Sequence, residues 1–135
     1  TKAVRWVLNN IEGIGSIHIL GATGGRADHT IGNLSLLMEY TRMCPLEEKE
    51  ITVESVSDHG TMFPVTDTVS LDCGEGRQIS VFSPDPTLKI KSQGLQWPTD
   101  DVVFDNWWKA TLNRASQDTV TLEFSHRSLA LVMMN

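Results

Sequence analysis

Hydrophobic residues in the first half of the chain recur with two different periods. Over residues 1–11 and again over residues 28–43 they recur every three or four positions, which predicts two amphipathic helices. The apolar run at residues 16–20 shows little alternation, as expected of a strand buried in a parallel sheet, and residues 50–57 predict a second strand. The apolar positions of the two helices are Val4, Val7, Leu8, Ile11, Ile31, Leu34, Leu37 and Met38. The order helix, strand, helix, strand predicts the end of a parallel, Rossmann-like α/β layer.

The second half of the chain, from about Thr66, has no lasting helical period. Short β-rich runs are separated by Gly, Pro, Asp and Ser at spacings of about ten residues, which predicts an antiparallel sandwich or barrel. These runs cover residues 68–74, 77–84, 87–93, 118–125 and 128–135. We expect residues 125–128 to form a hairpin turn and residues 102–112 to hold a helical turn. The fold class is therefore α/β over residues 1–66, followed by an all-β antiparallel sandwich over residues 67–135.

Composition narrows the partners that this chain is expected to have. Its 135 residues, 40% hydrophobic and 21% charged, can form one ordinary domain or two small ones. The formal net charge of −6 argues against nucleic acid as a partner. No apolar run approaches the roughly 18 residues that span a membrane, so we expect no membrane partner. Cys44 and Cys73 fit no metal-ligand spacing, and we expect two reduced, partly buried thiols in the cytoplasm.

The chain begins with Thr1, which could cap the first predicted helix, rather than with methionine. A domain that starts at the cap of an amphipathic helix leads us to expect further chain upstream of Thr1.

A glycine-rich turn follows the first predicted strand. Gly21, Gly24 and Gly25 can adopt positive φ and let a ligand approach the backbone. The next helix offers unpaired N–H groups at its start, and Arg26 adds a fork of donors suited to phosphate oxygens. The turn matches neither G-x-x-x-x-G-K-[ST] nor G-x-G-x-x-G. The residues predict an anion site, most plausibly for a phosphate chain, although a tight structural turn would use the same glycines.

Three polar residues after this turn also have structural explanations. Asp28 sits where an N-cap belongs, accepting a hydrogen bond from the N–H of Thr30 or Ile31. His29, in the first helical turn, is more often a surface or packing residue than a catalytic base. Asn33, one turn further on, could reach a ligand or face solvent.

The segment GATGGRADHTIGNLSLL (residues 21–37) closely resembles the G-x-x-G-G-R-x-D-H-x-x-x-N motif of thiamine pyrophosphokinases. Three further segments resemble that family in the same order. TKAV (residues 1–4) is similar to the residues after its acidic D-x-x-D motif, GLQWPT (residues 94–99) to its G-L-K-[WY]-x-L segment, and ATLNRAS (residues 110–116) to its G-T-S-N-E segment. The glycine-arginine motif is fairly specific, and the later two segments gain weight from their order.

The resemblance implies a fold and an activity. Members of the family transfer pyrophosphate from ATP, with Mg²⁺, to thiamine and release AMP. Their fold is an α/β catalytic domain followed by a β-sandwich, assembled as a homodimer, with the active site between the two domain types. Residues 1–66 would then be the C-terminal part of the catalytic domain, and residues 67–135 the thiamine-binding domain.

Several roles in the phosphate site follow from the resemblance alone. Arg26 would hold the transferring phosphates, with Gly24 and Gly25 beside it, and Asp28 would face the metal or the substrate. Lys2, after the acidic motif, would be a second phosphate contact. Without the family, a solvated lysine at the start of a helix would be the preferred interpretation of Lys2.

The thiamine site is carried over in the same way. Trp97 would line it, because an indole face attracts the thiazolium cation. Thr111 and Asn113 would hydrogen-bond the aminopyrimidine or its surroundings. Trp107 and Trp108 are expected to pack in the core and at its rim, although one of them could wall the pocket or a dimer interface.

The chain departs from the family pattern in two respects. Leu112 stands where the family usually has serine, and Arg114 where it has glutamate, which puts the substrate contacts of this loop in doubt. The metal-binding carboxylates of the family would lie upstream of Thr1, so we expect no metal ligand in this segment and little activity from it alone.

Three other functions compete with the kinase. The chain could belong to another nucleotide-dependent transferase, to a non-catalytic thiamine- or nucleotide-binding module, or to an interaction domain with an empty structural turn.

Overall fold

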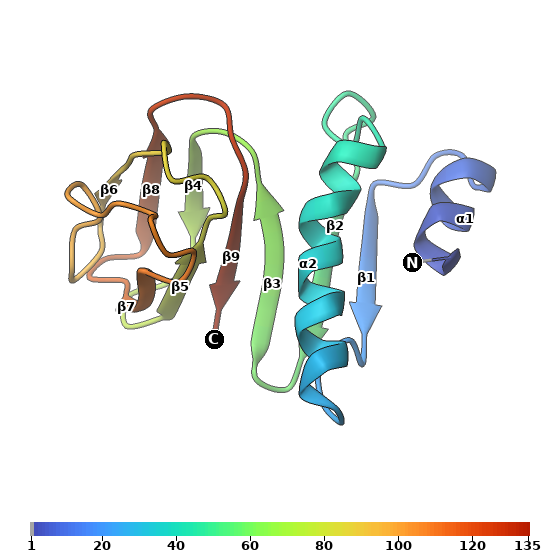
Figure 1. Cartoon of the computed structure of the whole chain (residues 1–135), viewed down its shortest axis with the longest axis horizontal. Coiled ribbons are helices and arrows are strands. Elements are labelled where there is room, and N and C mark those ends of the chain that lie inside the picture. Colours follow the sequence, from blue (N-terminus) through green and yellow to red (C-terminus); the bar gives the residue numbers. More distant parts are fainter. Residues whose placement is uncertain (1) are drawn as a thin grey trace. The chain divides into compact units, whose positions relative to one another are not determined.

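The computed structural model describes residues 2–135, which form two compact units, Thr1–Phe63 (unit 1) and Pro64–Asn135 (unit 2). Figure 1 shows that the helices belong to the first part of the chain and that the second part is built of strands and loops. The expected capping role of Thr1 lies outside the described residues. Neither described helix is long and apolar enough to cross a membrane.

Unit 1 contains the four elements that the hydrophobic periods predict. They are α1 (Lys2–Asn10), β1 (Ser16–Leu20), α2 (Ala27–Met43) and β2 (Thr52–Ser57). β1 pairs with β2 in parallel, from Ser16 opposite Thr52 to Leu20 opposite Val56, and α2 connects them. A fifth element, β3 (Gly60–Val65), runs antiparallel to β2 after a tight turn, and its last two residues belong to unit 2. The predicted parallel pairing is therefore confirmed.

Burial in unit 1 is less complete than the apolar pattern predicts. Val4 and Leu8 are buried on α1, and Leu37 and Tyr40 on α2. The predicted core positions Ile11 and Ile31 are exposed instead. The prediction that β1 is a buried strand is wrong, because none of its residues is buried and Leu20 is 75% exposed. β1 is an edge strand in the sheet order, so it has a pairing neighbour on one side.

Unit 2 is all-β, as predicted, and its strand pairs are antiparallel. β8 lies between β4 and β6, and β5 lies between β9 and β7. The bounds are β4 (Val69–Asp72), β5 (Gln78–Phe82), β6 (Ile90–Gln93), β7 (Ala110–Arg114), β8 (Thr119–Phe124) and β9 (Ala130–Met134). Alternate residues of β5 and β8 are buried, which is typical of sheets with one face on a core. The most deeply buried side chains include Ile79, Val81, Leu88, Ile90, Val120, Leu122 and Val132.

Two strands were not predicted from the sequence. β3 carries Pro64, which weakens a strand pattern because proline has no N–H to donate. β7 overlaps the end of the region where a helical turn was expected: residues 104–109 form turns and a bend but no helix, and lead into β7. A β-bulge in β7 breaks the alternation of its side chains, which hid the strand in the sequence.

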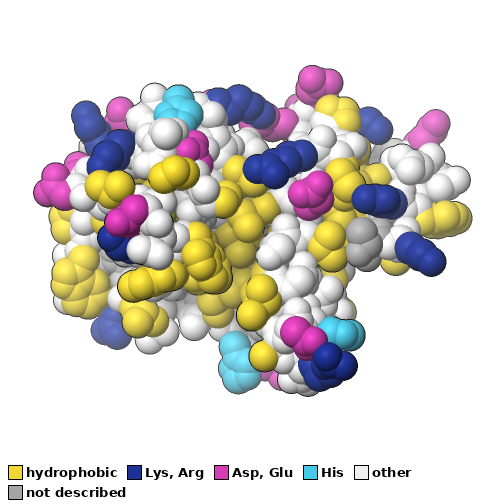
Figure 2. Space-filling view, viewed as in Figure 1, with side chains coloured by type: hydrophobic (Ala, Val, Ile, Leu, Met, Phe, Trp, Pro, Cys, Tyr) yellow, Lys and Arg dark blue, Asp and Glu magenta, His cyan; other side chains and the backbone are white. Residues whose placement is uncertain are grey.

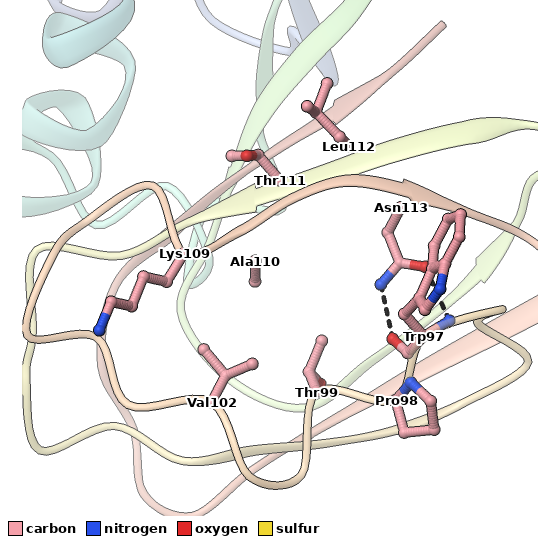
Figure 3. A pocket seen from close by; sticks show the side chains of 9 residues that line it. All are labelled: Trp97, Pro98, Thr99, Val102, Lys109, Ala110, Thr111, Leu112 and Asn113. Atoms are coloured by element: carbon pink, nitrogen blue, oxygen red, sulfur yellow. Dashed lines mark hydrogen bonds between the residues drawn. The ribbon is translucent and has the colours of Figure 1, made fainter.

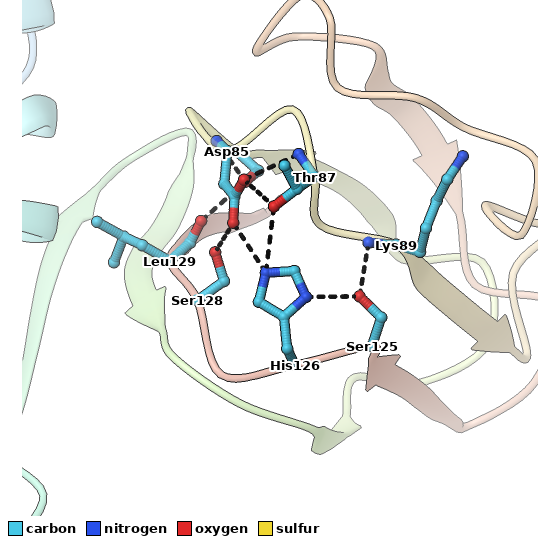
Figure 4. A network of polar contacts seen from close by, with 8 residues as sticks. Asp85, Thr87, Lys89, Ser125, His126, Ser128 and Leu129 are labelled. Atoms are coloured by element: carbon cyan, nitrogen blue, oxygen red, sulfur yellow. Dashed lines mark hydrogen bonds and ion pairs between the residues drawn. The ribbon is translucent and has the colours of Figure 1, made fainter.

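Residues 125–128 do not form the predicted hairpin turn. β8 pairs with β4 and β6, whereas β9 pairs with β5, so residues 125–129 are a crossover loop between two different groups of strands. A polar network holds this loop (Figure 4). The Asp85 carboxylate accepts hydrogen bonds from the Ser128 hydroxyl at 2.6 Å and the Thr87 hydroxyl at 2.6 Å, and lies 3.0 Å from Nε2 of His126. Polar residues at a strand end suit either kind of turn, so the sequence could not separate them.

Candidate functional site

The glycine turn of unit 1 (residues 21–25) has the backbone that its composition predicts. Gly21, Gly24 and Gly25 have φ values of 70°, 102° and 73°, in the left-handed region that favours glycine. The turn connects the end of β1 to the start of α2 at Ala27. Asn33 ties the helix to this turn, because its side-chain amide donates a hydrogen bond to the carbonyl of Ala22 at 3.0 Å.

Arg26 and Asp28 form a two-pronged ion pair at the start of α2. Nη2 of Arg26 donates to Oδ2 of Asp28 at 2.6 Å, and Nε donates to Oδ1 at 3.1 Å. The guanidinium holds the pKa of the Asp28 carboxyl below its usual value. The expected capping role of Asp28 is wrong: the N-cap residue is Arg26, with no side-chain cap, and Oδ1 of Asp28 accepts from the N–H of His29.

This ion pair limits what the glycine turn can bind. The side chains of Arg26 and Asp28 are 76% and 59% exposed, so the pair faces solvent and stabilises the fold little. A phosphate group would have to compete with the Asp28 carboxylate for the same face of the guanidinium. Lys2 is exposed in the first turn of α1, and His29 is exposed on α2. The turn therefore presents the exposed guanidinium of Arg26, for which the Asp28 carboxylate competes with any bound anion.

Unit 2 brings the three predicted thiamine residues together. Trp97, Thr111 and Asn113 all line a pocket of about 170 Å³, the small pocket (Figure 3). The same three residues also line a second pocket of about 510 Å³, the large pocket. They come from β7 and from the loop before it, so the wall between the two pockets is built from segments distant in sequence.

Asn113 is committed to the backbone of Trp97. Its side-chain amide donates to the carbonyl of Trp97 at 2.6 Å, and its Oδ1 accepts from the N–H of Trp97 at 3.2 Å (Figure 3). Oδ1 also accepts from the N–H of Arg114 at 2.9 Å. Asn113 is buried, whereas Trp97 is 55% exposed. In this geometry Asn113 positions the tryptophan and has little hydrogen-bonding capacity left for a ligand.

Leu112 has the most unusual conformation in the pocket wall. β5 and β7 lose register between Ile79 and Val81, so two residues of β7 face Ser80, whose hydroxyl accepts the N–H of Leu112 at 3.0 Å. Leu112 has a φ of 59° and is 86% exposed. A leucine in the left-handed region costs roughly 1–2 kcal/mol. Strain combined with exposure of an apolar side chain points to a functional position.

The large pocket lies over the outer face of β9, β5 and β7. Side chains at alternate positions of a strand share one face, which explains why Gln78, Ser80 and Phe82 meet here, whereas the bulged strand β7 contributes four consecutive residues. The lining residues from these strands are Gln78, Ser80, Phe82, Thr111, Leu112, Asn113, Arg114 and Met133, joined by Asn135, Trp97 and Trp108. Hydrophobic side chains reach the surface over this unit in Figure 2. A volume of about 510 Å³ falls within the range of pockets that hold small organic ligands.

The two neighbouring tryptophans have different surroundings. Trp108 lines the large pocket, whereas Trp107 packs against Phe82, with ring centroids 5.3 Å apart. Each is 53% exposed, so the prediction that one of them packs in the core is wrong. Phe82, Ser80 and Met133 were not singled out from the sequence. The period-two pattern of β5 carried a signal for the first two, but only the pairing of β5 with β7 and β9 shows that this face is a pocket.

The part of the chain that the structure describes does not fit a magnesium site. No three His, Cys, Asp or Glu side chains come together there in an arrangement that could hold a metal ion. Asp28, the carboxylate three residues after Gly25, is already paired with Arg26. Carboxylate oxygens are the ligands that Mg²⁺ prefers, so this donor set alone does not account for metal binding.

A glycine turn after a parallel strand and an aromatic pocket in an antiparallel unit are typical of a protein that binds small organic ligands. Residues 60–130, more than half of the chain, match the family model described as thiamin pyrophosphokinase, substrate-binding domain. The chain belongs to the thiamin pyrophosphokinase family. A search of curated proteins found no match to it.

Solved structures share the fold across almost the whole chain. Thiamine pyrophosphokinase from Bacillus subtilis superposes with a TM-score of 0.79 at 20% identity, covering 99% of this chain and 60% of its own. The Geobacillus thermodenitrificans protein gives 0.72 at 22% identity with the same two coverages. The Candida albicans protein gives 0.71 at 15% identity, covering 98% of this chain and 50% of its own. The chain thus spans less than two thirds of the length of these relatives.

Proposed function

We propose that the protein containing this chain is a thiamine pyrophosphokinase, which transfers pyrophosphate from ATP to the hydroxyl of thiamine and releases AMP. The proposal includes Mg²⁺ with ATP as co-substrate, a Rossmann-like catalytic layer to which unit 1 contributes, a homodimer and a cytoplasmic location. It rests chiefly on one observation: within a chain of this family, Trp97, Thr111 and Asn113 meet in one wall between two pockets.

The chemistry of unit 2 supports an aromatic ligand. Trp97, Trp108 and Phe82 give the large pocket three aromatic side chains, and a partly exposed indole attracts an organic cation by roughly 0.5–2 kcal/mol. Asn113 bonds both backbone groups of Trp97, so the loop segment that carries the indole is fixed before a ligand arrives. In this proposal thiamine packs against Trp97, and the Thr111 hydroxyl is a hydrogen-bonding group toward the ring.

The chemistry of unit 1 supports an anionic ligand. The left-handed glycines leave backbone N–H groups open to phosphate oxygens, and Arg26 supplies a guanidinium beside them. When the triphosphate binds, its phosphate oxygens replace the Asp28 carboxylate as the hydrogen-bonding partner of the Arg26 guanidinium. Mg²⁺ would supply charge neutralisation to the phosphates, and its carboxylate ligands would have to come from outside the residues that the structure describes. The roles of Lys2, Gly24, Gly25, Arg26 and Asp28 in this step are part of the proposal.

Isothermal titration with thiamine tests the binding half of this function. Thiamine should bind the chain, and Trp97→Ala should weaken binding by about 10-fold, because it removes the indole face. Trp6→Ala is the matched control, since Trp6 is similarly exposed but lies on α1 in unit 1. Equal affinity of both variants would contradict the assignment of Trp97.

The catalytic half is tested on the complete protein by AMP release from Mg-ATP and thiamine. Arg26→Gln should lower kcat/KM, whereas thiamine affinity should stay unchanged. AMP release without thiamine, or none with it, would contradict the proposed reaction.

One observation favours a second candidate, a thiamine- or nucleotide-binding module without catalysis. The described residues do not assemble a metal site, and Arg26 is paired with Asp28. This candidate predicts thiamine binding by the complete protein without AMP release, so the same two measurements separate it from the kinase.

A further inference from the structure

The large pocket of unit 2 has an unexpected charge. The chain carries 17 acidic and 11 basic side chains, yet no Asp or Glu lines this pocket. Its lining has one charged side chain, the guanidinium of Arg114. A pocket built to favour a free cation would be expected to present a carboxylate, because an opposite charge stabilises the bound ion and a like charge opposes it.

Arg114 is placed to act on a ligand in this pocket. It lies two positions after Leu112 on β7 and opposite Gln78 on β5, so it shares the outer strand face with both. Arg114 is exposed, and within the described part of the chain no carboxylate forms an ion pair with it. Two cations of the other candidate positions are paired instead, Arg26 with Asp28 and Lys109 with Asp105.

The remaining polar groups of the large pocket suit an anion as well. Gln78 and Asn135 contribute side-chain amides and Ser80 a hydroxyl, all of which can donate hydrogen bonds to phosphate oxygens. A guanidinium binds a phosphate group through two parallel N–H donors, which no other side chain in this pocket can do.

We propose that Arg114 sets the charge preference of the large pocket, so that it takes a heteroaromatic ring carrying a phosphate ester in preference to the same ring with a free hydroxyl. The ring packs against Trp97 and Trp108, and the ester group lies at Arg114. The identity of the ring, a thiamine-like heterocycle, rests on the proposed function. The charge preference rests on Arg114 and on the absence of acidic side chains from the pocket lining. Applied to the proposed reaction, it means that the phosphorylated product is held more tightly than the cationic substrate.

Tryptophan fluorescence of the whole chain, titrated with thiamine and with thiamine monophosphate at equal ionic strength, measures this preference directly. The monophosphate should bind the unaltered chain about 3- to 10-fold more tightly than thiamine, and the difference should shrink as salt is added. Arg114→Gln should abolish the difference, and Arg114→Glu should reverse it. Lys91→Glu is the control, because Lys91 is an exposed cation on β6 that lines neither pocket, and its ratio should match that of the unaltered chain.

The possible outcomes separate this inference from the proposed function. If thiamine binds and Arg114→Glu leaves the affinity ratio unchanged in a variant with the unaltered melting temperature, the inference is wrong and the thiamine site stands. If neither ligand changes the fluorescence, both fail. If inorganic phosphate displaces the monophosphate at equal concentration, the ring plays no part and the proposed ligand class is wrong. The inference would also be wrong if the unaltered chain bound thiamine more tightly than thiamine monophosphate.

Discussion

The glycine turn of unit 1 and the pockets of unit 2 are built over different distances along the chain. Arg26 and Asp28 are two residues apart and largely exposed, and the bonds between them need only a local turn. Trp97 and Asn113 are 16 residues apart, and the amide that joins them is buried. A local, exposed arrangement is weakly held and easily rearranged, whereas a buried amide that bonds both sides of a distant backbone segment is rigid. The turn is therefore suited to exchanging partners and the pocket to presenting a fixed surface.

Removing Asn113 should have the largest effect on stability. Asn113→Ala leaves the N–H and C=O of Trp97 without their partner, and we expect a loss of about 2–4 kcal/mol in the free energy of unfolding. Asn33→Ala is the matched control in unit 1, because that amide makes one hydrogen bond near the surface, and it should cost less than about 1 kcal/mol. Urea denaturation measures both. Equal losses in the free energy of unfolding would contradict the claim that the Asn113 bonds are held more rigidly than those of the glycine turn.

The crossover loop provides the next largest effect, and it depends on pH. Hydrogen bonds from Ser128 and Thr87 hold the pKa of the Asp85 carboxyl well below its usual value. Because the folded pKa is depressed, this stabilisation is present above the unfolded pKa and is lost as pH falls from about 5 toward 2. Asp85→Asn should lower the free energy of unfolding by about 1–2 kcal/mol at pH 7 and flatten its acid dependence. If the free energy of unfolding depends on pH in the same way in both proteins, the Asp85 carboxylate has no such role.

Substitutions at Leu112 should change the stability of the chain and its affinity for thiamine independently. Leu112→Gly relieves the left-handed backbone and should raise stability by about 0.5–1 kcal/mol, while thiamine affinity falls because an apolar contact is lost. Leu112→Ala is the control: it removes the same contact but keeps the strain, so affinity should fall without a gain in melting temperature. Calorimetry gives both quantities. A Leu112→Gly chain that is more stable and binds thiamine unchanged would show that the leucine does not touch the ligand.

The smallest effect on stability is expected at the glycine turn. Asp28→Asn should leave the melting temperature within experimental error, because the pair is exposed. It should nevertheless tighten the binding of inorganic pyrophosphate by about 3-fold, since Arg26 loses its competitor. Titration calorimetry of Asp28→Asn, with Asp28→Asn/Arg26→Gln as the control, measures this. Weaker binding by the single variant would mean that Asp28 itself takes part in the site.

Much of unit 1 could be predicted because its signals are local. The helical periods located α1 and α2, and the glycines required positive φ at the turn. The predicted cap was wrong by two residues: the N-cap is Arg26, and the Asp28 carboxylate bonds Arg26 and the N–H of His29 rather than the N–H of Thr30 or Ile31. Burial was also overestimated, because an apolar residue such as Leu20 indicates a strand but does not tell which neighbours cover it.

In unit 2 the sequence predicted strands but not how they connect. The sequence predicts a hairpin turn at residues 125–128, in the crossover loop, because polar residues at a strand end do not encode which strand pairs next. β7 was missed because its bulge interrupts the period of two. Trp97, Thr111 and Asn113 could be named only through the family resemblance, and their meeting in one wall depends on pairings between segments far apart in the chain.

The sequence alone determined the order of helices and strands in unit 1, the all-β character of unit 2 and the left-handed glycine turn, because side-chain period and glycine stereochemistry act over a few residues. Only the tertiary structure decided that Asn113 brackets the backbone of Trp97, that β8 and β9 belong to different strand groups, and that Arg114 is the one charged side chain lining the large pocket. These features depend on which distant segments pair, and that choice is made by packing of the whole core.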